Sequence, residues 1–150
     1  MKLRKKLLSK NMAFRLKIII PERIVYEGDV TSVILPSAMG EIEILDGHLP
    51  IIGILEAGTV FYTEKSSHVP IAIDTGFFKF FDQELLLLTE AAIDVQTIDA
   101  ASLDAAVQRA QEALEKAKHE KQIDEEELER LDKMLRFRVA QKLTKQAKRS

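Results

Sequence analysis

The sequence contains no cysteine, which excludes disulfide bonds and zinc sites built from thiolates. No apolar run comes near the ~20 residues that a helix needs to cross a bilayer. The net charge of −2 argues against general nucleic-acid binding, because such binding depends on neutralising many phosphates. With 46% hydrophobic and 31% charged residues, the 150-residue chain has the composition of a globular protein, either one domain or one small domain with an appendage.

Motifs that carry common chemistries are absent as well. The sequence has no GxGxxG or GxxxxGK[ST] phosphate-binding loop and no GxSxG nucleophile turn. The histidines, His48, His68 and His119, lie in separate segments, without a metal-type spacing to another histidine. We therefore predict no metal site and no cofactor.

The first eleven residues, MKLRKKLLSKN, are basic, and their longest apolar run is Leu7-Leu8. A secretory signal needs an apolar stretch of ~7–15 residues, so this segment is not one. We interpret residues 1–11 as a disordered basic leader. Two alternatives stay open: sequence upstream of a start at Met12, and weak attraction to an anionic membrane surface.

Between Phe14 and about Val95 the pattern is typical of β-strands. Short apolar or alternating segments are bounded by turn signals such as Glu27-Gly28, Pro36 and Asp82-Gln83. The predicted strands are FRLKI, TSVIL, EIEIL, TVFYT, PIAID, FFKFF and ELLLLT. No helix-length segment interrupts them, so we predict a β-sandwich or flattened barrel over residues 12–97.

The hydrophobic period changes at Ile98 to the spacing of three and four that marks one buried helix face. The first stripe is Leu103, Ala106, Val107, Ala110, Ala113, Leu114 and Ala117, and the second is Leu128, Leu131, Leu135, Val139 and Leu143. Asp99 and Asp124 are placed to cap the two helices. We expect an antiparallel two-helix hairpin over residues 98–150 and an α+β fold class for the whole chain. Its alanine-rich first stripe buries little area, so the hairpin is expected to be held loosely.

Acidic residues gather in GEIEILDGHLP, residues 40–50. In a strand, Glu41 and Glu43 share one face, and the two isoleucines share the other. The cluster allows acid–base catalysis with His48, the solvated face of an edge strand, or contact with a partner protein. No oxyanion donors or pocket-forming glycines accompany the carboxylates, which argues against catalysis.

The C-terminal end carries the opposite charge. From residue 133 onward there are basic residues and no acidic ones: Lys133, Arg136, Arg138, Lys142, Lys145, Lys148 and Arg149. This run is longer than the last helical turn, in which basic residues complement the helix dipole. It indicates an acidic partner or a membrane surface, and a solvated helix face explains it equally well.

The succession of these segments resembles the ε subunit family of F-type ATP synthases, called δ in mitochondria. The resemblance runs from Met12 to the end of the chain and rests on IIIPERIVYEGDVTSVILPSAMGEIEILDGHLPII, IAIDTGFFKFFDQELLLLTEAAI, IDAASLDAAVQRAQEAL and the basic LTKQAK. It implies a β-sandwich followed by a helical hairpin, with no catalysis of its own. In the family the sandwich joins the γ subunit to the ring of c subunits. The three rotate together and couple proton or sodium flow to ATP synthesis on the αβ assembly.

The resemblance also implies a peripheral position on the cytoplasmic side of the bacterial inner membrane, or on the equivalent organellar face. It places the c-ring contact at Met39, Gly40, Glu41, Glu43, Asp46, Gly47 and His48. Two of these residues depart from the family, because Asp46 stands where proline is usual and Glu43 where glycine is usual. Both changes make this face more acidic, so we expect a matching basic residue on the loop of the c subunit.

The hairpin is implied to be regulatory, since in many bacterial members it leaves the sandwich, extends along γ and blocks ATP hydrolysis. Its basic face (Lys133, Arg136, Arg138, Lys142 and Lys145) would then meet acidic segments of the α and β subunits. Some members bind ATP through an Ile/Leu-Asp-x-x-Arg-Ala sequence. Here Ile98 and Asp99 match, but Ser102 and Leu103 replace the arginine and the alanine, so we expect weak or absent ATP binding.

Two hypotheses from other classes compete with the rotor subunit. One is a free-standing β-sandwich adaptor whose basic helix recognises an unrelated acidic protein. The other is a small hydrolase built on Glu41, Glu43 and His48. The rotor subunit is favoured because it accounts for both halves of the chain and for the missing catalytic motifs.

Overall fold

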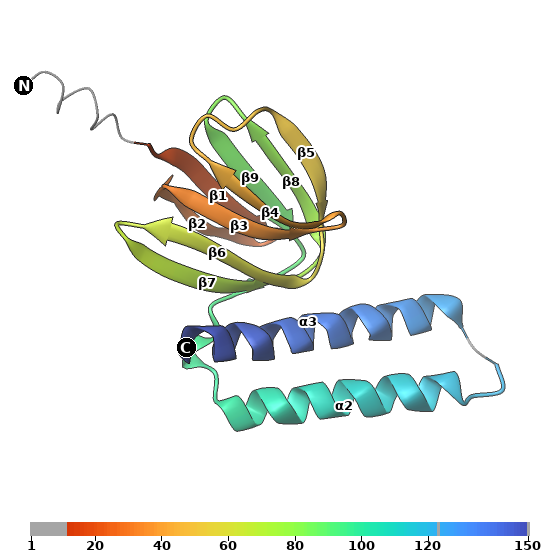
Figure 1. Ribbon diagram of the computed structural model, residues 1–150. Helices are drawn as coiled ribbons and strands as arrows, with labels where there is room; N and C mark the ends of the chain where they lie inside the picture. Colours follow the sequence, from red (N-terminus) through yellow and green to blue (C-terminus); the bar gives the residue numbers. More distant parts are fainter. Residues whose placement is uncertain (1–11, 123, 150) are drawn as a thin grey trace, which may run out of the picture.

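The computed structural model describes residues 12–122 and 124–149. The predicted leader over residues 1–11 lies outside the described residues, as do the side chains of Lys148 and Arg149. Within the described part, a ten-stranded sheet folds into a nearly closed sandwich, and two helices follow it (Figure 1). The predicted α+β class, with a sandwich before a helical hairpin, is therefore confirmed.

The strands follow one another from residue 14 to residue 93. They are β1 (Phe14–Ile20), β2 (Arg23–Val30), β3 (Ser32–Ser37), β4 (Gly40–Leu45), β5 (Ile51–Leu55), β6 (Gly58–Glu64), β7 (Ser67–Ile73), β8 (Gly76–Phe81), β9 (Glu84–Thr89) and β10 (Ala92–Ile93). Hydrogen bonds order them β10-β7-β6-β3-β5-β8-β9-β1-β2, and β4 pairs with β3 off this path. The β1–β9 pair is parallel, whereas the other pairs are antiparallel.

The core lies between the two halves of this sheet and is built from alternate residues of each strand. In β8 the buried apolar residues are Phe78 and Phe80, and in β9 they are Leu85 and Leu87. Phe14 of β1 meets Phe80 edge-on, with ring centroids 5.5 Å apart. The period of two that predicts the strands is thus the period with which they fill the core.

Three strands were not predicted: β2, β5 and β10. Glu27-Gly28 was interpreted as a turn but lies inside β2, and Pro36 lies inside β3. Gly28 is needed there for a close approach, because a Cβ at this position would come within 2.6 Å of the Tyr26 hydroxyl. Tyr26 in turn stacks on Tyr62 of β6, with ring centroids 4.4 Å apart, so β2 meets β6 through an aromatic pair.

The helical part begins with the short 3-10 helix η1 (Val95–Thr97), followed by α2 (Ala100–Lys118) and α3 (Glu125–Arg149). Both predicted caps are present, because the Asp99 carboxylate accepts from the Ser102 amide at 3.1 Å and the Asp124 carboxylate accepts from the Glu126 amide at 3.0 Å. The helices fold back on each other, and α3 lies between α2 and the sandwich (Figure 1). No helix in the described part of the chain is long and apolar enough to cross a membrane.

Burial along α2 follows the predicted stripe, with Leu103, Val107, Ala110 and Leu114 buried. Along α3 the predicted stripe holds only in part. Leu143 is 54% exposed, while Ala140, Gln141 and Thr144 are buried. The reason is that α3 contacts α2 on one side and strands β6 and β7 on another, so one apolar stripe cannot describe it.

A few polar contacts join α3 to the rest of the chain. The Thr144 hydroxyl donates to the Ala140 carbonyl at 2.7 Å, so the Thr59 hydroxyl of β6, 2.8 Å away, is the donor to Thr144. The Lys145 ammonium donates to the Gln96 carbonyl of η1 at 2.7 Å. A looser ion pair of 3.9 Å links Arg136 to Glu56, just before β6. The polar part of the docking therefore rests on a few specific contacts, beside the packing of α3 on β6 and β7.

Candidate interaction surface

The tip of the β3–β4 hairpin is held by a serine. The Ser37 hydroxyl donates to the Gly40 carbonyl at 2.6 Å and accepts from the Met39 amide at 3.2 Å. Gly40 has φ +108°, a conformation that side chains other than glycine rarely adopt. Met39 is 93% exposed at the end of this ordered turn. An apolar side chain is thus presented on a fixed backbone.

The turn that follows β4 is tied to the β8–β9 turn through Gln83. The Gln83 amide nitrogen donates to the Asp46 carboxylate, and its oxygen accepts from the Gly47 amide at 3.2 Å. His48 is half-buried, with Nδ1 2.7 Å from the Leu49 carbonyl and its ring edge-on to Phe80 at 5.9 Å. Asp46, Gly47 and His48 therefore form a structured corner of the sandwich.

Glu41 and Glu43 are exposed on one side of β4, and Ile42 and Ile44 face the other way, as predicted. Because β4 pairs only with β3, it is an edge strand. In the described residues, no hydrogen bond or ion pair joins either glutamate to His48. Nor does that part of the chain contain three His, Asp or Glu side chains arranged to hold a metal ion. The cluster offers carboxylates to solvent and has no catalytic geometry.

A second surface was not predicted, and it lies on the outer side of β5, β8 and β9. Ile52 is 75% exposed, Ile54 53%, Phe77 60%, Phe81 58% and Leu88 44%, and we call these five residues the apolar sheet face. Strand pairing places them side by side, because Ile54 lies opposite Phe77 and Phe77 opposite Leu88. Two phenylalanines more than half exposed on one sheet make this face a candidate site of protein contact.

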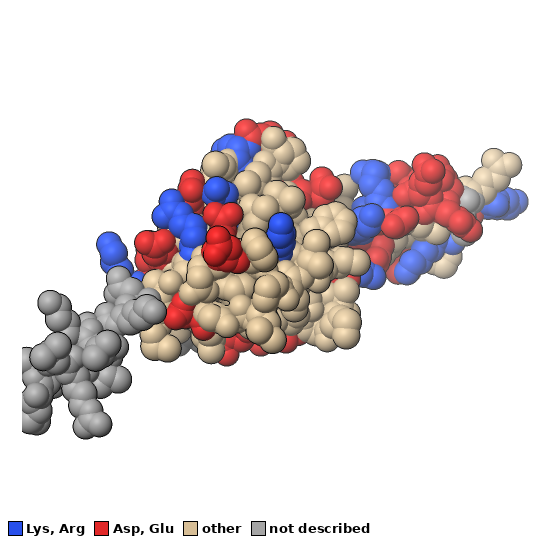
Figure 2. Space-filling model, turned by 90° about the horizontal axis from the view of Figure 1, so that it is seen from above, with Lys and Arg blue, Asp and Glu red and all other residues tan. Residues whose placement is uncertain are grey.

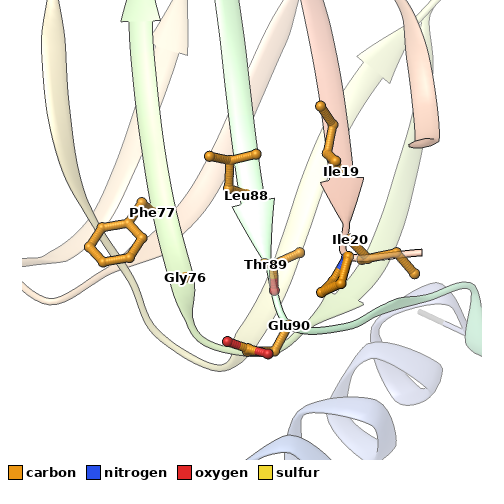
Figure 3. Close-up of a pocket in the computed structure, with 8 residues that line it drawn as sticks. Ile19, Ile20, Gly76, Phe77, Leu88, Thr89 and Glu90 are labelled. Carbon is orange, nitrogen blue, oxygen red and sulfur yellow. The ribbon is translucent and has the colours of Figure 1, made fainter. Parts of the chain in front are cut away.

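Grooves extend the apolar sheet face at both ends. Near β1 a groove of about 330 Å³ is lined by Ile19, Phe77, Leu88 and their neighbours, and Figure 3 shows these side chains on adjacent strands. Near β4 a groove of about 390 Å³ is lined by Met39, Ile52, Ile54 and others. Met39 thereby connects the predicted c-ring contact to the apolar sheet face. Figure 2, which looks down on the sandwich from above, shows a broad area of the surface without Lys, Arg, Asp or Glu.

A network of ion pairs on β1, β2 and β9 lies beside the apolar sheet face. Arg15 lies 3.1 Å from Glu27 and 3.5 Å from Asp29, and Lys17 lies 3.6 Å from Glu27 and 4.0 Å from Glu84. The hydrogen bond from Arg15 holds the pKa of Glu27 below its usual value, and Lys17 adds to the effect. These cations and anions satisfy one another within the chain.

The predicted basic face of α3 is also occupied within the chain. Lys133 pairs with Glu129, Arg136 with Asp132 and Glu56, and Lys142 with Asp104 of α2, while Arg138 donates to Gln141 and Lys145 to Gln96. In this docked conformation each of the five cations already has a partner. Asp99, from the partial nucleotide motif, serves as the cap of α2, and Ile98 is half-buried in the connection before it.

The family model of the ATP synthase delta/epsilon chain β-sandwich domain matches residues 13–95, which include every strand described above. The chain belongs to this family. ATP synthase epsilon chains match it as well. The one from Lawsonia intracellularis is 35% identical over 108 residues, covering 72% of this chain and 81% of the relative. The one from Streptomyces avermitilis is 36% identical over 105 residues, covering 69% and 79%.

Solved structures show the same fold at low sequence identity. A chain in the Euglena gracilis mitochondrial ATP synthase OSCP/F1/c-ring structure superposes with a TM-score of 0.70 at 18% identity, covering 88% of this chain and 82% of that one. A chain in the Tetrahymena thermophila central stalk/c-ring structure gives 0.56 at 11% identity, covering 85% and 95%.

Family membership confirms the resemblance and the expectation of a non-catalytic ATP synthase subunit. The hydrolase hypothesis is wrong, and the free-standing adaptor loses its support. The apolar sheet face is the main feature that sequence reasoning missed. Its signal was present in FFKFF and IIGIL, where residues on both sides of the strand are apolar.

Proposed function

We propose that the chain is a rotor subunit of the central stalk, which couples ion flow through the c ring to ATP synthesis. The observation that carries this proposal is the apolar sheet face, which shares a groove with Met39 at the tip of the β3–β4 hairpin that also bears the exposed Glu41 and Glu43. A subunit that joins two partners must offer a surface to each of them. The apolar face suits permanent contact with γ, and the polar tip suits the loops of the c ring.

In this proposal residues 12–97 form the docking part. The c-ring contact is made by Met39, Gly40, Glu41, Glu43, Asp46, Gly47 and His48. Gln83 fixes the second half of this contact, and Ser37 fixes the first half. The chain then sits peripherally on the membrane through the complex, on the cytoplasmic side in bacteria or on the equivalent organellar face.

Reconstitution tests this role. Membranes of the source organism stripped of the subunit should regain ATP-driven ion pumping when the full chain is added back, and γ, α, β and c should co-purify with a tagged chain. Glu43→Lys should weaken coupling, because it reverses a charge on the c-ring face, whereas Glu120→Lys in the α2–α3 connection should not. Full pumping without the chain, or co-purification with unrelated proteins alone, would contradict the proposal.

The second part of the proposal concerns residues 98–150, which we assign a regulatory role. The polar contacts that dock the hairpin are a threonine pair, one ammonium–carbonyl bond and one loose ion pair, and these can be exchanged for others. On release, Arg136 and Lys145 would lose their partners in the sandwich and the connection, and both could pair with acidic segments of the α and β subunits.

Truncation after Asp99 tests the regulatory role. The shortened chain retains the whole sandwich, so it should still support coupled synthesis, while inhibition of ATP hydrolysis by the subunit should disappear. Equal hydrolysis rates in complexes with the full and shortened chains would remove the regulatory role and leave the coupling role intact.

A further inference from the structure

One charged side chain lies in the middle of the apolar sheet face. Lys79 of β8 is exposed and lies directly opposite Ile52 of β5 on one side and Leu86 of β9 on the other. Along its own strand, the next residues on the same face are Phe77 and Phe81. All four nearest neighbours of this lysine on the sheet are therefore apolar.

The ammonium of Lys79 lies over this apolar surface. Its Nζ is 5.5 Å from the centroid of the Phe81 ring, the geometry of a cation–π contact. Within the described residues, Lys79 makes no ion pair with a carboxylate. Lys17, on the same outer side of the sheet, contrasts with it because both Glu27 and Glu84 lie within 4.0 Å.

Docking of any protein on the apolar sheet face changes the environment of this ammonium. Covering Phe77, Phe81 and Ile52 removes water from around Lys79, and a buried ammonium without a counter-charge is strongly unfavourable. The Phe81 ring offsets only part of that cost. A stable interface must therefore supply an acceptor at this point, and a carboxylate is the group that neutralises the charge.

We propose that Lys79 pairs with an Asp or Glu carboxylate of the protein segment that covers the apolar sheet face. The occupant is then an apolar surface of γ with one acidic residue opposite the centre of β8. This inference rests on the proposed rotor function and adds a residue that selects the partner and fixes its register. A like-charged or wholly apolar surface would leave the ammonium unpaired, so the lysine discriminates against it.

Binding of the full chain to the F1 complex, stripped of this subunit and taken from the same organism, tests the proposal. We expect Lys79→Met to weaken binding at least about tenfold, because it leaves the carboxylate of γ buried and unpaired. Lys79→Glu should weaken it further, and Lys79→Arg should retain most of the affinity. Lys121→Met, in the exposed α2–α3 connection, is the matched control and should bind as the wild type does.

The opposite sign of the effect would overturn the proposal. If no carboxylate faces Lys79, then Lys79→Met removes an uncompensated charge from an apolar interface, and binding becomes tighter or stays unchanged. Failure of the wild-type chain to bind the stripped complex would overturn the rotor function, and this inference with it. If the wild-type chain binds and Lys79→Met binds equally well, this inference is overturned and the rotor function is not.

Zero-length cross-linking gives a second readout. A carbodiimide activates a carboxyl group, and attack by the Lys79 amine releases the urea by-product and leaves an amide bond between the two chains. Mass spectrometry should find Lys79 joined to an Asp or Glu of γ, and the cross-link should be missing with Lys79→Arg. Cross-links from other lysines without one from Lys79 would contradict the pairing.

Discussion

At the scale of single residues, two glycines set how closely the strands approach each other. A Cβ on Gly76 would overlap the Leu88 carbonyl oxygen of the neighbouring strand, which is backbone and cannot turn away. A Cβ on Gly53 would come within 2.5 Å of the Phe78 ring, which is a side chain in the core. Neither position accommodates a Cβ. At Gly76 the neighbouring backbone would have to move, and at Gly53 the Phe78 ring would.

We expect Gly53→Ala to destabilise the chain by about 1–3 kcal/mol, the usual range for overpacking, and Gly76→Ala by more than that. Urea denaturation of the full chain measures both. In a Phe78→Leu background the added cost of Gly53→Ala should shrink, while that of Gly76→Ala should not. A smaller loss for Gly76→Ala than for Gly53→Ala would contradict the close backbone approach.

The tyrosine pair gives a prediction in pH. Burial raises the pKa of both Tyr26 and Tyr62, and the Glu64 carboxylate raises them further. In the unfolded chain both ionise near pH 10, while in the folded chain they stay protonated beyond it. Above pH 10 the unfolded state then binds fewer protons than the folded state. The contribution of the two tyrosines to the free energy of unfolding should therefore be fully present below pH 10 and should fall as the pH rises above that value.

Absorbance of tyrosinate measures this directly, since the chain contains 2 tyrosines and no tryptophan. The folded chain should titrate above pH 10, and the urea-unfolded chain near it. Tyr26→Phe should reduce the loss of stability between pH 9 and pH 11. A folded-state titration coincident with that of the unfolded chain would show that the pair is not shielded.

At the scale of elements, strand β8 shows how far the sequence alone can lead. Its segment FFKFF is predicted as a strand because turn signals flank it. Lys79 marks the side of Phe77 and Phe81 as the outer one, but two phenylalanines on that side are as apolar as Phe78 and Phe80, and the pattern cannot say that they stay uncovered. The exposed apolar face follows only from the packing of the whole sandwich.

Two further elements show the same limit for different reasons. β2 was missed because glycine is a common turn residue. Gly28 is instead required inside the strand because it leaves room for the Tyr26 ring, which is held in place by Tyr62, a residue distant in the sequence. The stripe of α3 was right at Leu131 and wrong at Leu143, because the sequence does not say where the hairpin docks. Caps at Asp99 and Asp124 were predicted correctly, since capping is local.

Docking of α3 gives a prediction at this scale. Thr144→Val removes the acceptor of the Thr59 hydroxyl, which should cost about 1 kcal/mol in docking. Hydrogen exchange in the full chain should become faster in both α2 and α3 and remain unchanged in β8 and β9. Thr97→Val, at an exposed position of η1, is the control. Faster exchange in the sandwich core as well would mean that the variant destabilises the whole chain.

At the scale of the whole molecule, the acidic tip of the sandwich and the basic face of α3 differ in how much of their surroundings the sequence predicts. The acidic tip was singled out from its residue types, because Glu41, Glu43 and Asp46 stand out in a short segment, and its role as a c-ring contact stays a prediction. The basic face of α3 was also found, but its occupation by Glu56, Asp104 and others depends on the docked arrangement.

Calorimetry with the full chain tests the expected weak or absent binding of ATP at the start of α2. We expect calorimetry to show no micromolar binding of ATP, because Ser102 supplies neither the charge nor the paired donors of an arginine. Ser102→Arg, at an exposed position, should increase the affinity measurably, whereas Gln108→Arg further along α2 should not. Micromolar binding by the unmodified chain would contradict the importance of the missing arginine.

The apolar sheet face has a consequence for the life of the chain before assembly. A newly made copy exposes Ile52, Phe77 and Phe81 until another protein covers them. Surplus copies would then adhere to one another or be recognised by chaperones and proteases. The cell therefore has reason to match the synthesis of this subunit to that of its partner, and the abundance of the chain should follow the supply of assembly sites more closely than the amount of its messenger RNA.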